Sequence, residues 1–189
     1  MVALGDSRGP AGVEFLHEVL YAPGVPVDRK CAAVIAIAKR MQADASPLLK
    51  QRLGDRRAAV REYALRGLAA VGDGSAWDEA WDRLRIVLDD QVPSPPFGLV
   101  WATLSLQSDV VVMVCYLGRH LSDESRRERV VELIRDKWLH LYTAEQRWFD
   151  QFWAECNPTS PRLQRSGPDP QALADCAGSP LFTPVYSGT

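Results

Sequence analysis

The chain has 189 residues, of which 47% are hydrophobic and 24% are charged. These proportions are typical of soluble globular proteins and exclude wholesale disorder, and the length suits one domain with a sizeable core or a short stack of repeats. The formal net charge of −2 excludes a global positive field that would draw the chain to nucleic acid or to an anionic membrane. Any such binding must therefore be local.

The N-terminus, MVALGDSRGP, lacks the basic start and apolar core of a secretory signal, so we expect a cytoplasmic location. The most apolar span, residues 99–118, carries Gln107, Ser108 and Asp109 at its centre, which favours two buried segments over a membrane helix. The cysteines form no C-x-x-C pair, which predicts free, mostly buried thiols and no zinc site. They are Cys31, Cys115, Cys156 and Cys176.

Two apolar stripes with helical spacing lie on either side of the turn APGVPVD, residues 22–28, and predict a first helical hairpin. The stripes are Phe15, Leu16 and Leu20 before the turn, and Val27, Cys31, Ala32 and Ile35 from the end of the turn onward.

Residues 48–73, LLKQRLGDRRAAVREYALRGLAAVGD, predict a second hairpin. Gly54 is expected to end the first helix in a left-handed conformation, and Asp55 to accept hydrogen bonds from the N–H groups that open the second. Gly72 is expected to close the second helix after Val71. The apolar faces are Leu48, Leu49 and Leu53, then Val60, Ala64, Leu65 and Leu68.

A shift of 33 residues superimposes the apolar positions of the first hairpin on those of the second. A self-similar period of this length is typical of stacked helical repeats, in which each hairpin buries its apolar face against its neighbours. The second hairpin resembles a HEAT repeat, whose turn commonly carries an Asp followed five and six residues later by Val and Arg, as Asp55, Val60 and Arg61 are here. The first copy has Ala22 and Asp28 in place of the Asp and the Arg, so it would be a divergent or capping repeat.

The resemblance covers about residues 13–90. It implies an all-α fold, a short right-handed α-solenoid of HEAT-like helical hairpins, and a curved surface that grips a protein partner without catalysis. It also implies alternatives, because HEAT-like DNA glycosylases hold a damaged nucleotide in a cleft and other HEAT-like proteins attach pigments to cysteines.

Residues 75–90 predict the next helix, with Ser75 as its cap. The stretch QVPSPPFG, residues 91–98, then ends it, because a helix does not continue through three closely spaced prolines. Apolar segments follow at 97–106 and 110–121, and we interpret the second as a buried helix, since no alternating partner for a strand is visible. The apolar stripe of residues 75–90 is Trp77, Trp81, Leu84 and Leu88.

Ser122, followed by two acidic residues, predicts the start of another helix. Residues 143–146 match the capping box S/T-x-x-E/Q and predict a further short helix rich in aromatic side chains. Six of the thirteen prolines fall in residues 157–189, where no periodicity remains. We therefore expect a HEAT-like helical domain over residues 1–156 and an irregular Pro-rich C-terminal tail over residues 157–189, either docked in a groove or free.

Basic residues are concentrated locally: residues 28–66 hold ten Lys or Arg against four acids, whereas residues 73–90 hold six acids against two arginines. Because guanidinium groups form paired hydrogen bonds with phosphate oxygens, the arginines at the second turn are candidates for binding a partner or a phosphate. The alternative is that they form the solvated faces of amphipathic helices, with Arg61 in an ion pair within the repeat. The candidates are Arg52, Arg56, Arg57 and Arg61.

Trp77 and Trp81, interleaved with Asp78 and Asp82, are candidates for an aromatic and acidic pocket wall, since aromatic faces attract cations. The alternative is that the tryptophans face the core and the carboxylates face solvent, because the same spacing produces a buried stripe.

The three histidines are scattered, and the sequence contains no glycine-rich phosphate loop, G-x-S-x-G elbow or acidic metal cluster. We therefore predict no catalytic residue, no metal and no cofactor. The interpretation that we favour is a non-catalytic scaffold or adaptor with a protein partner, and the alternative is a nucleic-acid-binding protein or a HEAT-like DNA glycosylase.

Overall fold

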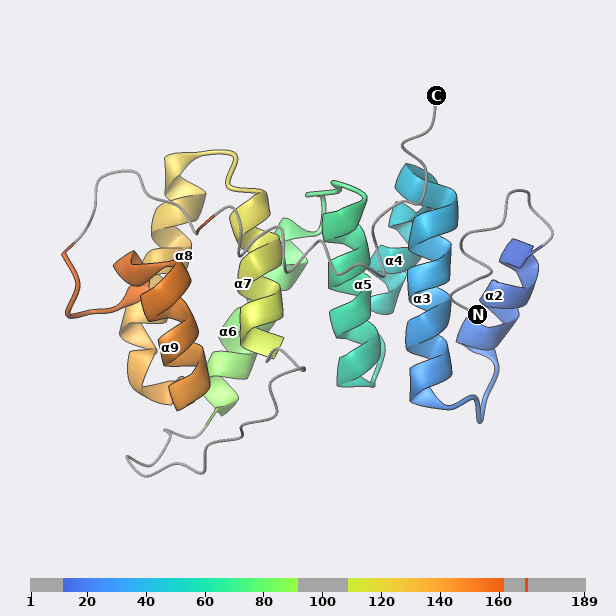
Figure 1. The fold of residues 1–189 in the computed structure, drawn as a ribbon, viewed down its shortest axis with the longest axis horizontal. Coiled ribbons are helices and arrows are strands. Elements are labelled where there is room, and N and C mark those ends of the chain that lie inside the picture. The colour runs from blue at the N-terminus through green and yellow to red at the C-terminus, as the bar shows by residue number, and fades with distance from the viewer. Residues whose placement is uncertain (1–11, 92–108, 162–168, 170–189) are drawn as a thin grey trace. The chain divides into compact units, whose positions relative to one another are not determined.

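The computed structural model describes residues 12–91, 109–161 and 169. Every regular element in these residues is helical, which confirms the all-α prediction (Figure 1). They belong to two compact units, which meet in sequence at the Gly74–Ser75 boundary. The predicted segment at 97–106 and most of the predicted tail lie outside the described residues.

Unit 1 contains two pairs of helices, which coincide with the two predicted hairpins. In the first pair α3 packs against α2, in the second α4 packs against α5, and α3 also packs against α5. The elements are α2 (Val13–Tyr21), α3 (Val27–Met41), the 3-10 helix η2 (Gln42–Ala45), α4 (Ser46–Arg52) and α5 (Ala58–Ala70).

Some, but not all, of the positions related by the 33-residue shift are buried in unit 1. Phe15 and Val27 of the first hairpin are exposed, so burial does not follow the repeat at these two positions. Gly67 allows a close approach of α5, because a Cβ at this position would meet Leu49 Cδ2 at 3.1 Å. Three pairs of equivalent residues are buried in both copies: Leu16 with Leu49, Cys31 with Ala64, and Ile35 with Leu68.

One of the two predicted glycine caps in unit 1 is confirmed and the other is wrong. Gly72 has a φ of 74°, and its N–H donates to the carbonyl of Ala69 while that of Asp73 donates to Leu68. This pair of hydrogen bonds closes α5 in a Schellman motif. Gly54 does not adopt a positive φ: the N–H groups of Gly54 and of the following Asp55 both donate to carbonyls three residues back, so the tight turn continues through Gly54.

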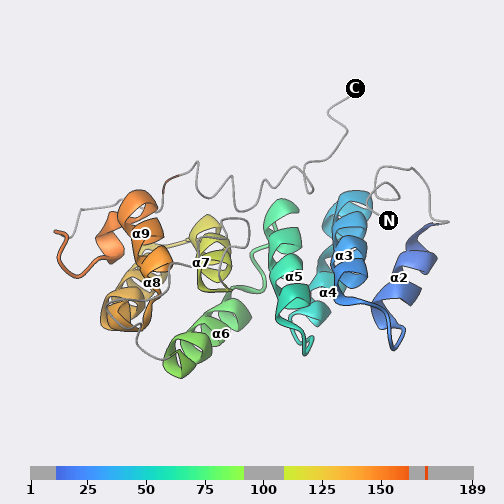
Figure 2. The same ribbon diagram turned by 60° about the horizontal axis from the view of Figure 1, so that its bottom comes forward.

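Unit 2 is built around α7, which packs against α6 and also contacts α8 and α9 (Figure 2). The short 3-10 helix η4 contacts both α8 and α9. The elements are α6 (Trp77–Asp90), α7 (Asp109–Arg119), α8 (Glu124–Asp136), η3 (Trp138–His140), α9 (Thr143–Phe152) and η4 (Ala154–Cys156).

The middle of α7 is buried on all sides, since every residue from Val110 to Leu117 is buried. This confirms the interpretation of the valine-rich segment as a buried helix and not a strand. Within residues 12–91 and 109–161, no helix combines the length and the apolar character needed to cross a membrane.

Two predicted helix starts in unit 2 are displaced by one residue. The cap of α8 is Asp123 and not Ser122, because the Asp123 carboxylate accepts a hydrogen bond from the Arg126 N–H at 2.8 Å. The residue before α6 is Ala76 and not Ser75, and no side chain caps this helix.

At the start of α9 the buried carboxylate of Glu145 takes the role that the predicted capping box gives to Gln146. Glu145 Oε2 accepts a hydrogen bond from the Tyr142 N–H at 2.8 Å and another from Gln91 Nε2 at 2.9 Å. Because α9 begins at Thr143, Tyr142 is the residue before the helix and Glu145 is its third residue. The capping box is therefore formed by Glu145 and not by Gln146.

The expectation of free thiols holds for Cys31 and Cys156, which are buried and unbonded. Burial raises the pKa of the Cys31 thiol to about 11. The expectation is wrong for Cys115 of α7, which is disulfide-bonded.

Candidate functional site

The α2–α3 and α4–α5 turns lie at the same end of unit 1, at its lower side in Figure 1 and nearer the viewer in Figure 2. We define the turn end as residues 21–30 and 50–61. It combines the C-terminal ends of α2 and α4 with the N-terminal ends of α3 and α5. Two acidic side chains, Asp28 and Asp55, accompany seven basic ones. The basic residues are Arg29, Lys30, Lys50, Arg52, Arg56, Arg57 and Arg61.

Asp55 is the centre of the arginine cluster at the turn end. Its Oδ1 accepts a hydrogen bond from the Arg57 N–H at 3.0 Å, and Arg61 Nη1 donates to its carbonyl oxygen at 2.8 Å. The carboxylate also lies 3.9 Å from Arg52 Nη1 and 4.0 Å from Arg57 Nε. Three of the four predicted arginines therefore meet at one residue, while the side chain of Arg56 is exposed.

Hydrogen-bond donors outnumber acceptors in this cluster. Arg52 Nε, Arg57 Nη1 and Arg61 Nε are buried and have no hydrogen-bond partner. The side chains of Arg52 and Arg57 nevertheless remain 13% and 22% exposed, so the cluster has an open side. An unpaired buried donor costs free energy, which means that the cluster retains unused hydrogen-bonding capacity.

Lys30 lies buried next to the arginine cluster. Its Nζ donates hydrogen bonds to the carbonyl oxygens of Leu20 at 2.5 Å and Ala22 at 3.0 Å, which caps the C-terminus of α2. Burial lowers the pKa of Lys30, and the positive charge of Arg57 lowers it further, against the opposing effect of Asp55. Lys30 is therefore a structural residue that experiences the positive potential of the turn end.

Two large hydrophobic side chains are exposed at the turn end. Tyr21 is 50% exposed and Val27 is 38% exposed. The guanidinium carbon of Arg52 lies 4.5 Å from the centre of the Tyr21 ring, and Tyr21 Oη donates to Gln51 Oε1 at 2.5 Å. The apolar pattern of the sequence does not single out Tyr21, although its position outside the apolar stripe of its helix is a usable signal.

In unit 2 the predicted pocket residues separate into two groups. Trp77 and Trp81 are buried and stacked, with ring centroids 5.7 Å apart, and Trp77 Nε1 donates to the carbonyl of Leu117 at 3.3 Å. Asp78 and Asp82 are exposed. The structure therefore brings the tryptophans together and places the carboxylates on the solvent side of α6.

Arginine side chains of the same chain lie over the rings of the two tryptophans. The guanidinium carbon of Arg126 lies 4.6 Å from the Trp77 ring centre, and that of Arg129 lies 5.0 Å and 4.7 Å from the Trp77 and Trp81 rings. Both arginines come from α8. Cation–π contacts of this kind join α8 to α6.

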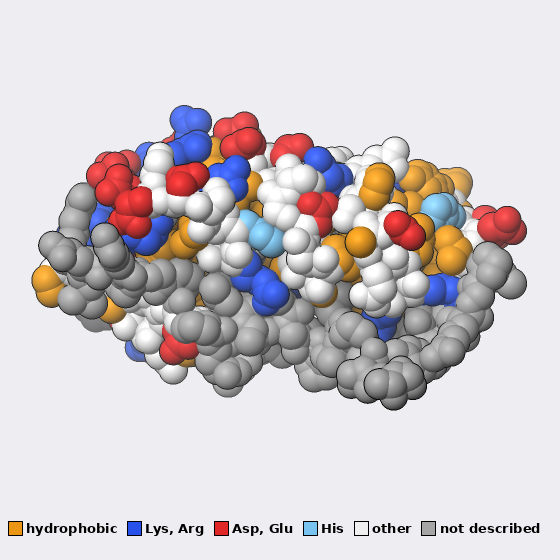
Figure 3. All heavy atoms as spheres, turned by 90° about the horizontal axis from the view of Figure 1, so that it is seen from above, with side chains coloured by type: hydrophobic (Ala, Val, Ile, Leu, Met, Phe, Trp, Pro, Cys, Tyr) orange, Lys and Arg blue, Asp and Glu red, His pale blue; other side chains and the backbone are white. Residues whose placement is uncertain are grey.

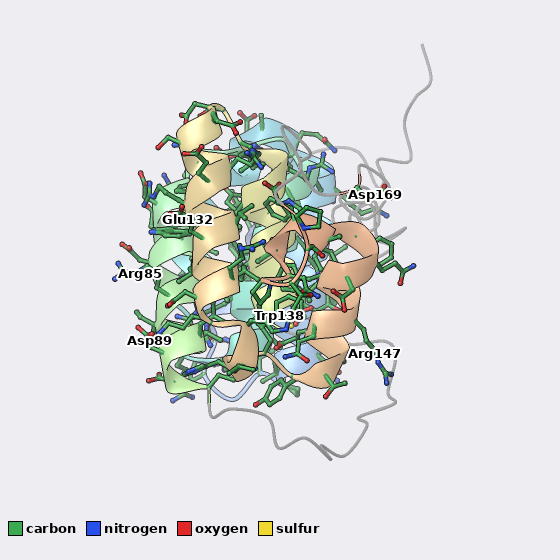
Figure 4. All side chains as sticks on the ribbon, turned by 90° about the vertical axis from the view of Figure 1, so that its left-hand side faces the viewer. Arg85, Asp89, Glu132, Trp138, Arg147 and Asp169 are labelled. Atoms are coloured by element: carbon green, nitrogen blue, oxygen red, sulfur yellow. The ribbon has the colours of Figure 1, made fainter. Side chains whose placement is uncertain are left out.

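The surface of unit 2 carries charges of both signs, which intermingle over its helices in Figure 3. Figure 4 shows Arg85 and Asp89 pointing outward from α6, and Arg147 pointing outward from α9. Lys137 Nζ lies 2.8 Å from Asp89 Oδ1. Trp138 packs against Phe149 of α9, with ring centroids 6.3 Å apart.

The part of the chain that the structure describes holds no group of three or more His, Cys, Asp or Glu side chains arranged to bind a metal ion. Compared with family models, with curated proteins and with solved structures, the chain has no significant match.

Proposed function

We propose that the protein is a non-catalytic interaction module of HEAT-like helical hairpins, stacked as a short solenoid, and that its turn end binds an acidic segment of a protein partner. The observation that supports this proposal is the exposure of Tyr21 beside Arg52 of the arginine cluster, and of Val27 at the same turn end. Tyr and Arg are enriched at the centres of protein interfaces, where the apolar area provides affinity and the charge provides orientation.

The charge of the turn end supports an acidic partner. Seven basic side chains accompany two acidic ones there, although the net charge of the whole chain is −2. The positive potential is therefore local, and it steers an acidic segment toward this end of unit 1. The packing of α3 against both α2 and α5 supports the stacking of the two hairpins.

Nucleic-acid binding by the same end is the second candidate, and the exposed Arg56 favours it. Phosphate contacts would make such binding fall steeply as salt rises. A glycosylase cleft at Trp77 and Trp81 is not part of this proposal, because Arg126 and Arg129 lie over those rings.

The test compares the wild-type protein with the double variant Tyr21→Ser/Val27→Ser. Each is immobilised and exposed to an extract of cells that express the chain, and the retained proteins are identified by mass spectrometry. The affinity of the purified partner is then measured by calorimetry. We expect the double variant to weaken binding by at least about tenfold, because it removes the apolar centre of the interface.

The matched control is Phe15→Ser, which removes a side chain that is 47% exposed on α2 but lies outside the turn end. This variant should retain the partner with unchanged affinity, and melting temperatures should show that all variants are folded. Equal weakening by the control, or release of all captured material by nuclease, would overturn the proposal. The second outcome would favour nucleic acid as the partner.

A further inference from the structure

Three arginines of the turn end form a compact cluster around one residue, Asp55. Arg52, Arg57 and Arg61 all lie within 4.0 Å of Asp55. An extended nucleic-acid backbone needs a track of separated cations, whereas a compact cluster suits one multiply charged group.

We propose that the turn end recognises a phosphorylated serine or threonine of the protein partner, held by the guanidinium groups of Arg52, Arg57 and Arg61. This inference rests on the proposed function, since it names the chemical group that the same surface takes from its partner. Arginine clusters are a recurrent means of recognising phosphorylated motifs.

The existing contacts leave the cluster only partly satisfied. The distances from the Asp55 carboxylate to Arg52 Nη1 and Arg57 Nε, 3.9 Å and 4.0 Å, exceed the range of a hydrogen bond. Asp55 therefore offsets positive charge there without accepting hydrogen bonds from these two guanidinium groups. Its contribution is a single negative charge among several positive ones.

A phosphate group would supply the hydrogen-bond acceptors and the negative charge that the arginine cluster lacks. It carries a charge of roughly −1.5 to −2 and three strong acceptor oxygens, and guanidinium groups bind such oxygens in pairs. The unpaired donors are Arg52 Nε, Arg57 Nη1 and Arg61 Nε, one from each arginine. Because these atoms are buried, the guanidinium groups must turn toward the incoming phosphate, and this movement relieves the cost of their unpaired donors.

The start of α5 adds an independent attraction for an anion. Its N-cap residue is Arg57, and no side chain caps the helix, which runs for 13 residues. The N-terminus of a helix of this length carries partial positive charge and favours a negatively charged group. The partial positive charge at the N-terminus of α5 would not attract a neutral or apolar partner.

The first test is an NMR titration of the full chain with O-phosphoserine at constant ionic strength, following the side-chain Nε–H signals of arginine. We expect the Arg52 and Arg61 signals to shift and saturate. The Arg66 signal should stay in place, because its Nε already donates to Glu62 Oε1 at 3.0 Å. Equal movement of all arginine signals would indicate general screening, and either that result or the absence of any shift would overturn the proposal.

The second test uses variants and a phosphoserine peptide derived from the captured partner. Arg57→Gln should weaken binding by about tenfold, because it removes a charged donor pair. Asp55→Asn should strengthen binding several-fold, since the amide oxygen can still accept from the Arg57 N–H while the competing charge is lost. The control Arg85→Gln removes an equal charge from an exposed site in unit 2 and should change nothing.

Two outcomes separate this inference from the proposed function. If the partner binds through Tyr21 and Val27 but dephosphorylation leaves its affinity unchanged, the phosphate site is refuted and the interaction module stands. If a single-stranded oligonucleotide binds more tightly than the phosphopeptide, both proposals give way to nucleic-acid binding. The titration of the wild-type chain remains decisive even if Arg57→Gln fails to fold.

Discussion

Lys30 closes the C-terminus of a helix that ended nine residues before it: its Nζ donates to the carbonyl oxygen of Leu20, and a second bond reaches Ala22. The last carbonyls of a helix have no partners within it, so the ammonium group satisfies the Leu20 carbonyl at a buried site and the Ala22 carbonyl at a partly buried one. A buried cation thus holds the first hairpin at its turn.

Lys30→Met should lower the free energy of unfolding by about 1–3 kcal/mol, because the carbonyls of α2 lose their donor while the volume is nearly conserved. Urea denaturation followed by circular dichroism measures this change. Lys39→Met, at a half-buried position of the same helix, is the control and should have a smaller effect. An effect of Lys30→Met no larger than that of the control would contradict the capping role.

The stability difference between the wild type and Lys30→Met should depend on pH. Burial, and then Arg57, lower the pKa of Lys30 in the folded state from its ordinary value of 10.5. Between the lowered pKa and 10.5 the unfolded chain binds more protons, so this residue contributes stability that increases as pH rises through that window. Denaturation curves at several alkaline pH values should show a widening gap, and a constant gap would argue against the lowered pKa.

The contacts of Arg129 with both tryptophans predict a loss of stability on its removal. Arg129→Ala should lower the free energy of unfolding by about 1 kcal/mol, the usual size of a cation–π contact at a partly exposed site. Tryptophan fluorescence during urea denaturation measures the change. Arg85→Ala, which loses only an exposed pair with Asp82, should stay within about 0.5 kcal/mol of the wild type.

The ion pair between Arg127 and Glu155 should respond asymmetrically to substitution. Arg127 Nη1 donates to both carboxylate oxygens of Glu155, at 2.6 Å and 2.5 Å, and Arg127 Nε also donates to Glu124 at 2.8 Å. Arg127→Met leaves the buried Glu155 carboxylate without its partner and should cost about 3–5 kcal/mol. Glu155→Gln should cost less, because Arg127 keeps Glu124.

Thermal unfolding of both variants measures this asymmetry. The double variant Arg127→Met/Glu155→Leu should recover part of the loss, since no buried charge is then left unpaired. Equal destabilisation by the two single variants would show that Glu124 does not compensate for Glu155.

Asp123→Ala should destabilise the protein at neutral pH and lose its effect in acid. The Arg126 N–H holds the pKa of Asp123 below its ordinary value of 3.8 in the folded protein. A lowered carboxyl pKa contributes stability that is present above the unfolded value and is lost as pH falls through the folded value. The melting temperatures of the variant and the wild type should therefore converge below pH 3.8. Ser122→Ala should have a smaller effect, because the Ser122 hydroxyl contributes less than the Arg126 N–H to the lowered pKa.

The positions of helices were predictable because burial has a helical period. The stripe of α6, which includes Trp77 and Trp81, is buried as the spacing indicates. The helix ends were less predictable, because several neighbouring residues can cap and backbone geometry selects among them. Asp123 is the cap and not Ser122 for this reason.

The candidate site was predictable only as a composition. The sequence indicates that Arg52, Arg57 and Arg61 share a turn, but not that a single carboxylate collects them or that their donors remain unpaired. Contacts between segments that are distant in the sequence could not be predicted from the sequence pattern. The pairing of Trp77 with Arg126 depends on how α6 packs beside α8, and no local pattern encodes that packing.

The burial of α7 from Val110 to Leu117 has a consequence for the substitutions that the chain tolerates. An amphipathic helix accepts polar substitutions along one side. A saturation screen of such a helix therefore shows positions that tolerate substitution recurring every three or four residues between intolerant ones. The segment from Val110 to Leu117 offers no permissive side. A screen for folded protein should therefore show an unbroken intolerant band across these eight positions, flanked by the more tolerant Arg119 and His120.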